Sequence, residues 1–283
     1  MTNPVGKGVW CWQLEQCLSG DVLSLAVEIK RLGCDYVVIK VANGMAESNA
    51  DLLPAAKAAF EALGISVWGY HYIYGGSTIT GNSIARQEAD VAIRVAKRFN
   101  LAGIFLDAEG QYKRKGGPVW ADTYLTAIKT TLPDLPLGLC SYRWPSVHPE
   151  FPWANFLRRV DFHAPQVYWM QAQNSGEQLR RSVKELTALK ALPIVPLGAA
   201  FFEHGWQPTV ASINEFDQVA HELKLPGVSW WCWDDRGLET HPEYYAAIAA
   251  HDWGDQPLPT QDWRWAMTHW ARSMGYIGPD PEG

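Results

Sequence analysis

Tyr36-Val37-Val38-Ile39-Lys40 is a β-branched run typical of a strand buried in a parallel sheet. The segment from Asp51 to Leu63 follows it, is rich in Ala and Leu, and ends at Gly64, so it predicts a helix. The two segments form one strand-helix unit. A chain built from such units predicts parallel strands covered by helices.

Seven further units of this kind extend on both sides of the first. The other predicted strands are residues 8–12, 65–74, 102–109, 137–142, 162–170, 194–200 and 228–234. The predicted helices between and after them are residues 22–32, 84–99, 120–132, 153–159, 176–189 and 210–223, with one beginning near His241-Pro242. Eight units without a hairpin signal between strands predict an α/β fold, a closed (β/α)8 TIM barrel over residues 1–254, rather than an open doubly wound sheet.

The alternation of predicted strands and helices ends after Asp252. Residues 256–260 (QPLPT) resemble a linker, and a short helix capped by Asp262 would then carry Trp263, Trp265 and Trp270. Residues 255–283 are therefore predicted to be a linker and a short C-terminal helical tail. The tail either packs on the barrel or docks on a partner in a larger assembly, since Trp is favoured at interfaces.

Composition narrows the function classes. The chain has 283 residues, of which 47% are hydrophobic and 19% charged, and this excludes disorder. Its 24 Lys and Arg against 30 Asp and Glu give a net charge of −6, which argues against a nucleic-acid partner. No apolar run is long enough for a membrane span. Residues 1–7 contain no apolar segment of a signal peptide, so localisation is left open and a cell-wall substrate would require another route of export.

The sequence holds no sign of a cofactor or a metal. Its five cysteines are scattered and form no C-x-x-C pair, so we predict buried, reduced thiols rather than disulfides or a zinc site. There is no Gly-rich phosphate loop at a strand end, and the first strand carries no H-x-H pair of metal ligands. A metal-dependent hydrolase therefore ranks below the hypotheses given below.

Asp107 and Glu109 are the sharpest functional feature. They end the predicted strand 102–109, and residues two apart on a strand share a face, so both carboxylates are expected in the barrel mouth where barrel enzymes work. Two close acids in an apolar setting repel each other, so that one holds a proton while the other stays ionised. Glycoside hydrolysis needs this division. The alternative is a salt-bridged or helix-capping pair that follows a strand.

Aromatic side chains crowd the same strand ends, and the chain contains 15 Trp in all. Sugar rings stack their C–H faces on Trp and Tyr, while sugar hydroxyls need polar partners. The aromatic residues predicted to line a sugar groove are Trp10, Trp12, Tyr70, Tyr72, Tyr142, Tyr168, Trp231 and Trp233. The polar residues predicted to contact the sugar are Asn43, Gln166 and Asp234.

Each of these residues also has a structural interpretation. Strand alternation sends half of the aromatic side chains behind the barrel, where they would be core. Asn43-Gly44 is equally a turn signal. His71 is predicted to be a hydrogen-bonded core histidine rather than a site residue.

Four segments in order resemble motifs of the glycoside hydrolase family 25 lysozymes. Residues 36–44 (YVVIKVANG) look like that family's FxIIKATEG, and residues 67–72 (VWGYHY) look like its GxYHF. Residues 86–89 (RQEA) resemble the helix start that follows, and residues 106–109 (LDAE) resemble LDxE, whose Glu is the family's proposed acid. The resemblance covers roughly the first 145 residues. It implies a (β/α)8 barrel that cleaves peptidoglycan, with Glu109 as acid.

The chain departs from this family at two positions. The family's first strand carries an Asp in GxDVS, but residues 8–13 (GVWCWQ) contain no acid, and Asn43 replaces the Glu of the second motif. Residues 166–168 and 227–231 are closer to chitinase-like barrels, which use a strand-four Glu and the acetamido group of the substrate as nucleophile. That resemblance implies Glu109 as acid, Asp107 orienting the acetamide, and Tyr168 donating a hydrogen bond.

Two hypotheses of different classes follow. The first is a glycoside hydrolase, independent of metal, that acts on a polysaccharide containing N-acetylhexosamine, with peptidoglycan as the favoured substrate and Glu109 and Asp107 as catalytic residues. The second is a catalytically silent barrel that binds glycan or is a structural part of a cell-wall-directed assembly. The missing first-strand acid and the Trp-rich tail favour the second.

Overall fold

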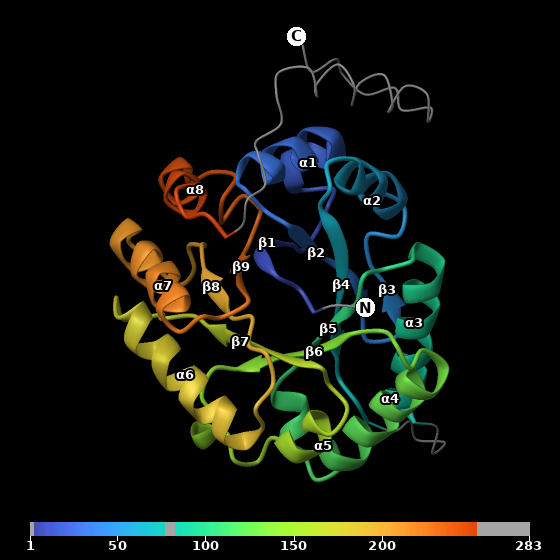
Figure 1. Cartoon of the computed structure of the whole chain (residues 1–283). Coiled ribbons are helices and arrows are strands. Elements are labelled where there is room, and N and C mark those ends of the chain that lie inside the picture. The colour runs from blue at the N-terminus through green and yellow to red at the C-terminus, as the bar shows by residue number, and fades with distance from the viewer. Residues whose placement is uncertain (1–2, 77–82, 254–283) are drawn as a thin grey trace.

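The computed structural model describes residues 3–76 and 83–253, and it confirms the (β/α)8 barrel. Helices surround a ring of eight parallel strands (Figure 1). The ring strands are β1 (Gly6–Cys11), β2 (Tyr36–Asn43), β4 (Ser66–Ile73), β5 (Ile104–Ala108), β6 (Leu137–Tyr142), β7 (Phe162–Val167), β8 (Leu197–Ala199) and β9 (Gly227–Trp231). The ring is closed because β1 pairs in parallel with both β2 and β9.

The helices between these strands lie close to their predicted positions. They are α1 (Val22–Arg31), α2 (Leu53–Ala62), α3 (Ile84–Phe99), α4 (Gly117–Thr131), α5 (Trp153–Leu157), α6 (Ser175–Leu189), α7 (Val210–Glu222) and α8 (Pro242–Ala249). Three 3₁₀ helices lie in the loops, namely η1 (Cys17–Gly20), η2 (Gly110–Lys113) and η3 (Pro145–Val147). Across residues 3–76 and 83–253, no helix is both long enough and apolar enough to span a membrane.

Three strand predictions were too long, and one small strand was not predicted. β7 ends at Val167 rather than at residue 170. β8 is only Leu197–Ala199, and β9 ends at Trp231 rather than at residue 234. A short strand, β3 (Ala46–Glu47), pairs antiparallel with the end of β2. Gly44-Met45 forms the turn between them, directly after Asn43 at the end of β2, and Gly44 has a φ of +58°, a conformation that favours glycine. The turn alternative for Asn43-Gly44 is therefore confirmed.

Strand alternation divides the core into two layers. Side chains on the inner face fill the barrel with aromatic rings, and Trp10 contacts Tyr70 and Phe105 at ring-centroid distances of 4.8 and 5.1 Å. Side chains on the outer face, such as Val37 and Ile39, pack against the helices. The aromatic plug fills the centre of the barrel, so a ligand site is left to the ends of the strands.

A buried lysine ties the end of the barrel chain to its beginning. The Nζ of Lys7 on β1 donates hydrogen bonds to the carbonyls of Leu32 after α1, at 2.9 Å, and Ile248 in α8, at 2.7 Å. The last and first helices are thus held against the same strand, and burial lowers the pKa of this ammonium.

Three other predictions have a clear outcome. All five cysteines are free and buried, as expected of reduced thiols. His71 is a core histidine, with its ring nitrogens 2.9 Å from the Tyr124 hydroxyl and 2.8 Å from the Gly44 carbonyl. The predicted linker and tail of residues 255–283, with Trp263, Trp265 and Trp270, lie outside the described residues, so the division at residue 254 stays a prediction.

Candidate active site

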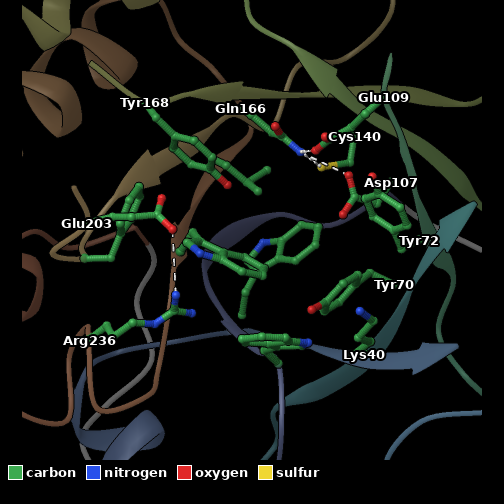
Figure 2. Close-up of a pocket in the computed structure, with 15 residues that line it drawn as sticks. Lys40, Tyr70, Tyr72, Asp107, Glu109, Cys140, Gln166, Tyr168, Glu203 and Arg236 are labelled. Carbon is green, nitrogen blue, oxygen red and sulfur yellow. Dashed lines mark hydrogen bonds and ion pairs between the residues drawn. The ribbon is translucent and has the colours of Figure 1, made fainter. Parts of the chain in front are cut away.

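A pocket of about 320 Å³ opens at the carboxyl ends of the strands, above the aromatic plug. This volume lies at the small end of the range for ligand pockets, which is about 300–1,000 Å³. Figure 2 shows its residues converging from strands and loops around the ring. The lining consists of Trp10, Trp12, Lys40, Tyr70, Tyr72, Asp107, Glu109, Cys140, Gln166, Tyr168, Leu197, Phe201, Glu203, Trp231 and Arg236.

Asp107 and Glu109 both reach this pocket, as the two-residue spacing predicts. Asp107 lies in β5 and is 7% exposed, and Glu109 follows the strand and is half-buried. The side-chain amide of Gln166 on β7 holds the two acids together, because its Nε2 donates to Asp107 Oδ1 at 3.0 Å and to Glu109 Oε1 at 3.1 Å. The dashed lines in Figure 2 show this shared nitrogen. The salt-bridge alternative is not met, since neither acid has a cation partner among the described residues.

Burial sets the proton affinity of this acid pair. Loss of solvent raises the pKa of Asp107 well above its usual range, the neighbouring Glu109 charge raises it further, and Lys40 and the Gln166 hydrogen bond oppose the rise. The free pair therefore holds a proton at pH values where an exposed aspartate has lost it. A pocket that stores a proton beside an ionisable partner is suited to acid-base chemistry.

The raised pKa predicts how stability depends on pH. Between the usual pKa of an aspartate, 3.8, and the raised value, the folded chain binds more protons than the unfolded chain, so the unfolding free energy falls as pH rises. Asp107→Asn removes this contribution and keeps an acceptor for Gln166. We expect the variant to be more stable than the wild type at pH 7, and we expect this difference to be smaller at pH 4. Urea unfolding at both pH values measures the two differences. An unchanged pH dependence would contradict the assignment.

Aromatic rings form the floor and walls of the pocket. Trp10 is fully buried, and its Nε1 donates to Ser229 Oγ at 3.0 Å, which fixes the ring on the floor. The ring centroid of Trp231 lies 5.8 Å from that of Trp10 and 5.9 Å from that of Tyr70. The hydroxyl of Tyr70 is buried and has no hydrogen-bond partner within the described part of the chain. Tyr168 stands against Phe201 on the opposite side.

Three charged residues complete the lining and had no predicted role. Lys40 ends the inner row of β2, while Glu203 and Arg236 come from the loops after β8 and β9. Figure 2 places Glu203 and Arg236 across the pocket from Lys40 and Asp107. Arg236 lies 3.2 Å from Asp234 and 3.8 Å from Glu203. Glu203, and not Asp234, is thus the third carboxylate in the pocket.

Four predicted site residues do not line this pocket. Asn43 is exposed and accepts from the Tyr74 hydroxyl at 3.3 Å, in a neighbouring cavity described below. The ring of Tyr142 stacks on the ring of His148 with 3.7 Å between the centroids, and Tyr142 is not part of the pocket lining. Trp233 is 2% exposed and packs on Tyr245 behind the barrel. Asp234 is 3% exposed and accepts hydrogen bonds from the backbone and side chain of Arg236.

The misplacement of Trp233 and Asp234 has a simple cause. The predicted strand continues past Trp231 to residue 234 and puts Trp233 on the same face as Trp231, but β9 ends at Trp231. The backbone N–H of Trp233 then donates to the Trp10 carbonyl at 2.8 Å, and its ring lies in the outer core. We therefore withdraw Trp233 as a sugar contact.

Asn49 braces one rim of the pocket. Its Nδ2 donates to the carbonyls of Trp12 at 2.9 Å and Lys40 at 2.8 Å, and its Oδ1 accepts from the Leu14 N–H at 2.9 Å. Its φ of +55° lies in the left-handed region, which Asn tolerates better than most residues. One side chain thus fixes the backbone of both Trp12 and Lys40.

Asn49→Ala is expected to lower the unfolding free energy by about 2–4 kcal/mol, because three partly buried hydrogen bonds are lost. Asn49→Gly relieves the backbone, and Asn49→Asp keeps the acceptor for Leu14 but loses both donors. We expect both variants to lose stability as well, which urea unfolding measures. If Asn49→Gly kept the unfolding free energy of the wild type, the backbone conformation at residue 49, and not its side-chain hydrogen bonds, would determine the stability of this segment.

The pocket offers no cluster of metal ligands. Across the described ranges, no three His, Cys, Asp or Glu side chains are grouped so that they would hold a metal ion.

No family model and no curated protein matches the sequence. Solved structures match in fold. A family GH18 chitinase from Cycas revoluta, in complex with allosamidin, is 11% identical, with a TM-score of 0.64 over 88% of this chain and 99% of the chitinase. An endo-1,4-β-D-mannanase from Thermotoga petrophila is also 11% identical, with a TM-score of 0.63 over 86% and 98%.

A third similar structure is the spore cortex-lytic enzyme SleL of Bacillus megaterium, 11% identical, with a TM-score of 0.57 over 86% of this chain and 73% of SleL. At such identities the similarity establishes the barrel fold alone. The function must be argued from the pocket itself.

Proposed function

We propose that this protein is a glycoside hydrolase that cleaves polymers containing N-acetylhexosamine. The observation that carries the proposal is the acid pair, Asp107 and Glu109, held on one amide nitrogen beneath a wall of aromatic rings. The rings supply stacking faces for a sugar, and the acids supply the proton that a leaving glycosidic oxygen needs. The chitinase and SleL structures share this fold and support the choice of chemistry, whereas the mannanase shows that the fold alone does not decide it.

Glu109 is the general acid in this proposal. When the substrate acetamide N–H donates to Asp107, that hydrogen bond favours the ionised form of Asp107, so the proton of the pair moves to Glu109. Glu109 then protonates the glycosidic oxygen as that bond breaks. The acetamide oxygen of the substrate bonds to the anomeric carbon. Water later attacks this carbon and releases the acetamide, and Glu109 takes the proton of the water.

Tyr168 and Gln166 assist this step without exchanging protons. Burial raises the pKa of the Tyr168 hydroxyl well above its usual range, so it stays protonated and donates a hydrogen bond to the acetamide oxygen. Gln166 keeps the two acids at a fixed separation through its two hydrogen bonds. No carboxylate on the first strand is required, because the nucleophile belongs to the substrate.

Peptidoglycan is the proposed polymer. The order of lysozyme-like motifs in the first half of the chain supports it, and SleL is, by its name, a cortex-lytic enzyme on the same fold. The test is to incubate the protein with purified peptidoglycan and to measure both the released reducing ends and the protein that sediments with the wall. We expect release of reducing ends and soluble fragments of disaccharide spacing.

A catalytically silent glycan-binding barrel is the second candidate. It is favoured by the first strand, where Trp10 and Trp12 line the pocket and no acid is present. Sedimentation with the wall without release of reducing ends would support this candidate and contradict hydrolysis.

A further inference from the structure

Lys40 places a positive charge inside the aromatic pocket. Its Nζ lies over the rings of Trp12, Tyr70 and Tyr72, 5.7, 5.8 and 5.8 Å from their centroids. The side chain is half-buried, and loss of solvent lowers the pKa of the ammonium while the field of Asp107 opposes the drop. Aromatic faces attract the charge but accept no full hydrogen bond in place of water.

The Lys40 ammonium differs from Arg236 and Lys113 in having, among the described residues, neither an ion-pair partner nor a hydrogen-bond partner. Among the described residues, no carboxylate oxygen lies within 4.0 Å of it and no acceptor forms a hydrogen bond with it. Arg236 is paired with Asp234 and Glu203, and the Nζ of Lys113 lies 2.7 Å from His148 Nδ1. Within residues 3–76 and 83–253, no acceptor therefore receives the N–H donors of this ammonium.

A second cavity of about 520 Å³ begins at the same lysine. It is lined by residues of the β1–α1 and β2–α2 loops, and it shares only Trp12 and Lys40 with the first pocket. Asn49 fixes the backbone of both shared residues. The two cavities are therefore adjacent, with Lys40 at their junction, and we infer that the path of a longer polymer runs from the acid pair across Trp12 into the second cavity.

Charge restricts where an anionic group would fit along this path. Glu15, Glu47 and Asp51 line the second cavity, and only Glu47 is neutralised there, by Arg94 at 2.7 Å and Arg98 at 3.3 Å. The carboxylates of Glu15 and Asp51 therefore disfavour an anion in the second cavity. The junction at Lys40 is the place where an anion gains a partner.

We propose that Lys40 binds a carboxylate of the glycan at the junction of the two cavities, so that the preferred substrate is an acidic polymer of N-acetylhexosamine. This inference rests on the proposed function and narrows its substrate class. The carboxylate belongs either to a lactyl ether that carries no peptide or to a neighbouring uronic acid, and both present the same planar anion to the ammonium.

The test compares Lys40→Met with Lys97→Met, both in the Glu109→Gln background so that ligands stay intact. Lys97 is exposed on α3, so its loss changes the net charge equally without touching the pocket. The probes are a neutral N-acetylglucosamine tetramer, a tetramer carrying free lactyl carboxylates, its methyl ester, and a tetramer alternating with glucuronate. Calorimetry at low and high salt gives each Kd.

Lys40→Met is expected to raise the Kd of at least one carboxylate tetramer about tenfold, to leave the neutral tetramer and the ester within about twofold, and to remove most of the salt dependence. The tetramer that responds identifies the source of the carboxylate. Lys97→Met should change no Kd, and Lys40→Arg should retain the preference for the acidic tetramer.

If Lys40→Met raised the Kd of neutral and acidic tetramers equally, the proposal would be overturned, because Lys40 would then act through Asp107 or the aromatic rings. No rise for any tetramer would overturn it as well. Charge-selective binding without hydrolysis by the wild type would leave this inference standing and refute the proposed function. Hydrolysis of the tetramers without charge-selective binding would refute this inference and leave the proposed function standing.

Discussion

Glu109→Gln is expected to lower the rate of glycan hydrolysis by about 10²–10⁴-fold while the Kd for the same glycan changes less than about threefold. A positioned general acid accounts for about 10²–10⁴ in rate, and glutamine donates no proton to a leaving oxygen. The amide keeps the size of the side chain and an oxygen for the hydrogen bond from Gln166 at 3.1 Å, so the pocket should stay intact. The loss should therefore fall on kcat.

Reducing-end release over time gives the rate for this variant, and calorimetry gives the Kd. Glu61→Gln is the matched control, because Glu61 is exposed on α2, pairs with Lys57 and lies outside the pocket. Hydrolysis by Glu109→Gln at the rate of this control would remove Glu109 as the acid. A parallel loss of rate and binding would mean that Glu109 holds the ligand and does not protonate it.

Asp107→Asn should be the second most damaging change, with a loss of about 10²–10³-fold in kcat. In the proposed step the ionised Asp107 receives the acetamide N–H and faces a developing positive charge, and a fixed anion in a buried site contributes an effect of this size. Asparagine is neutral at every pH, so it cannot pass its share of the proton to Glu109. The same change is expected to raise stability at pH 7, because burial is what raises the pKa of the aspartate.

The two effects of Asp107→Asn have opposite signs, and this makes the variant informative. Residual activity and urea unfolding should be measured on one preparation at pH 7. Lower activity with higher stability would show that the buried acid is kept for chemistry at a cost to the fold. Lower activity with lower stability would contradict the assignment, because Asp107 would then be a structural residue.

Periodicity alone was enough to predict the barrel. The run at 36–40 is mostly β-branched and the run at 137–142 is mostly apolar, and the segments between the predicted strands have apolar residues at helical spacing. α3 and β6 have the bounds that we expected, Ile84–Phe99 and Leu137–Tyr142. β8 was overestimated, because Ile194-Val195-Pro196 is apolar but makes only an isolated bridge to β7.

The acid pair was placed correctly in the pocket by the same alternation. Strand pleating fixes the side of Asp107 relative to Phe105, and the sequence shows that relation directly. Alternation failed at Trp233, since a pattern says nothing of where a strand stops, and β9 stops at Trp231.

Residues on loops were beyond the reach of the pattern. Glu203 and Arg236 enter the pocket from the loops after β8 and β9, and their pairing depends on loop paths that no local periodicity encodes. Lys40 did carry a signal, because it shares the inner face of β2 with Val38 and lies near the carboxyl end of that strand. We expected the strand end to matter but gave the lysine no role there.

The most direct test of the account compares the wild-type protein on two tetramers of equal length, one of N-acetylglucosamine and one of glucose with the same β-1,4 linkage. Mass spectrometry of the products reports cleavage of each. The account predicts that the acetylated tetramer is cleaved and the glucose tetramer is not, because only the first carries the acetamide that attacks the anomeric carbon. Cleavage of both at similar rates, or binding of the acetylated tetramer without cleavage, would contradict it.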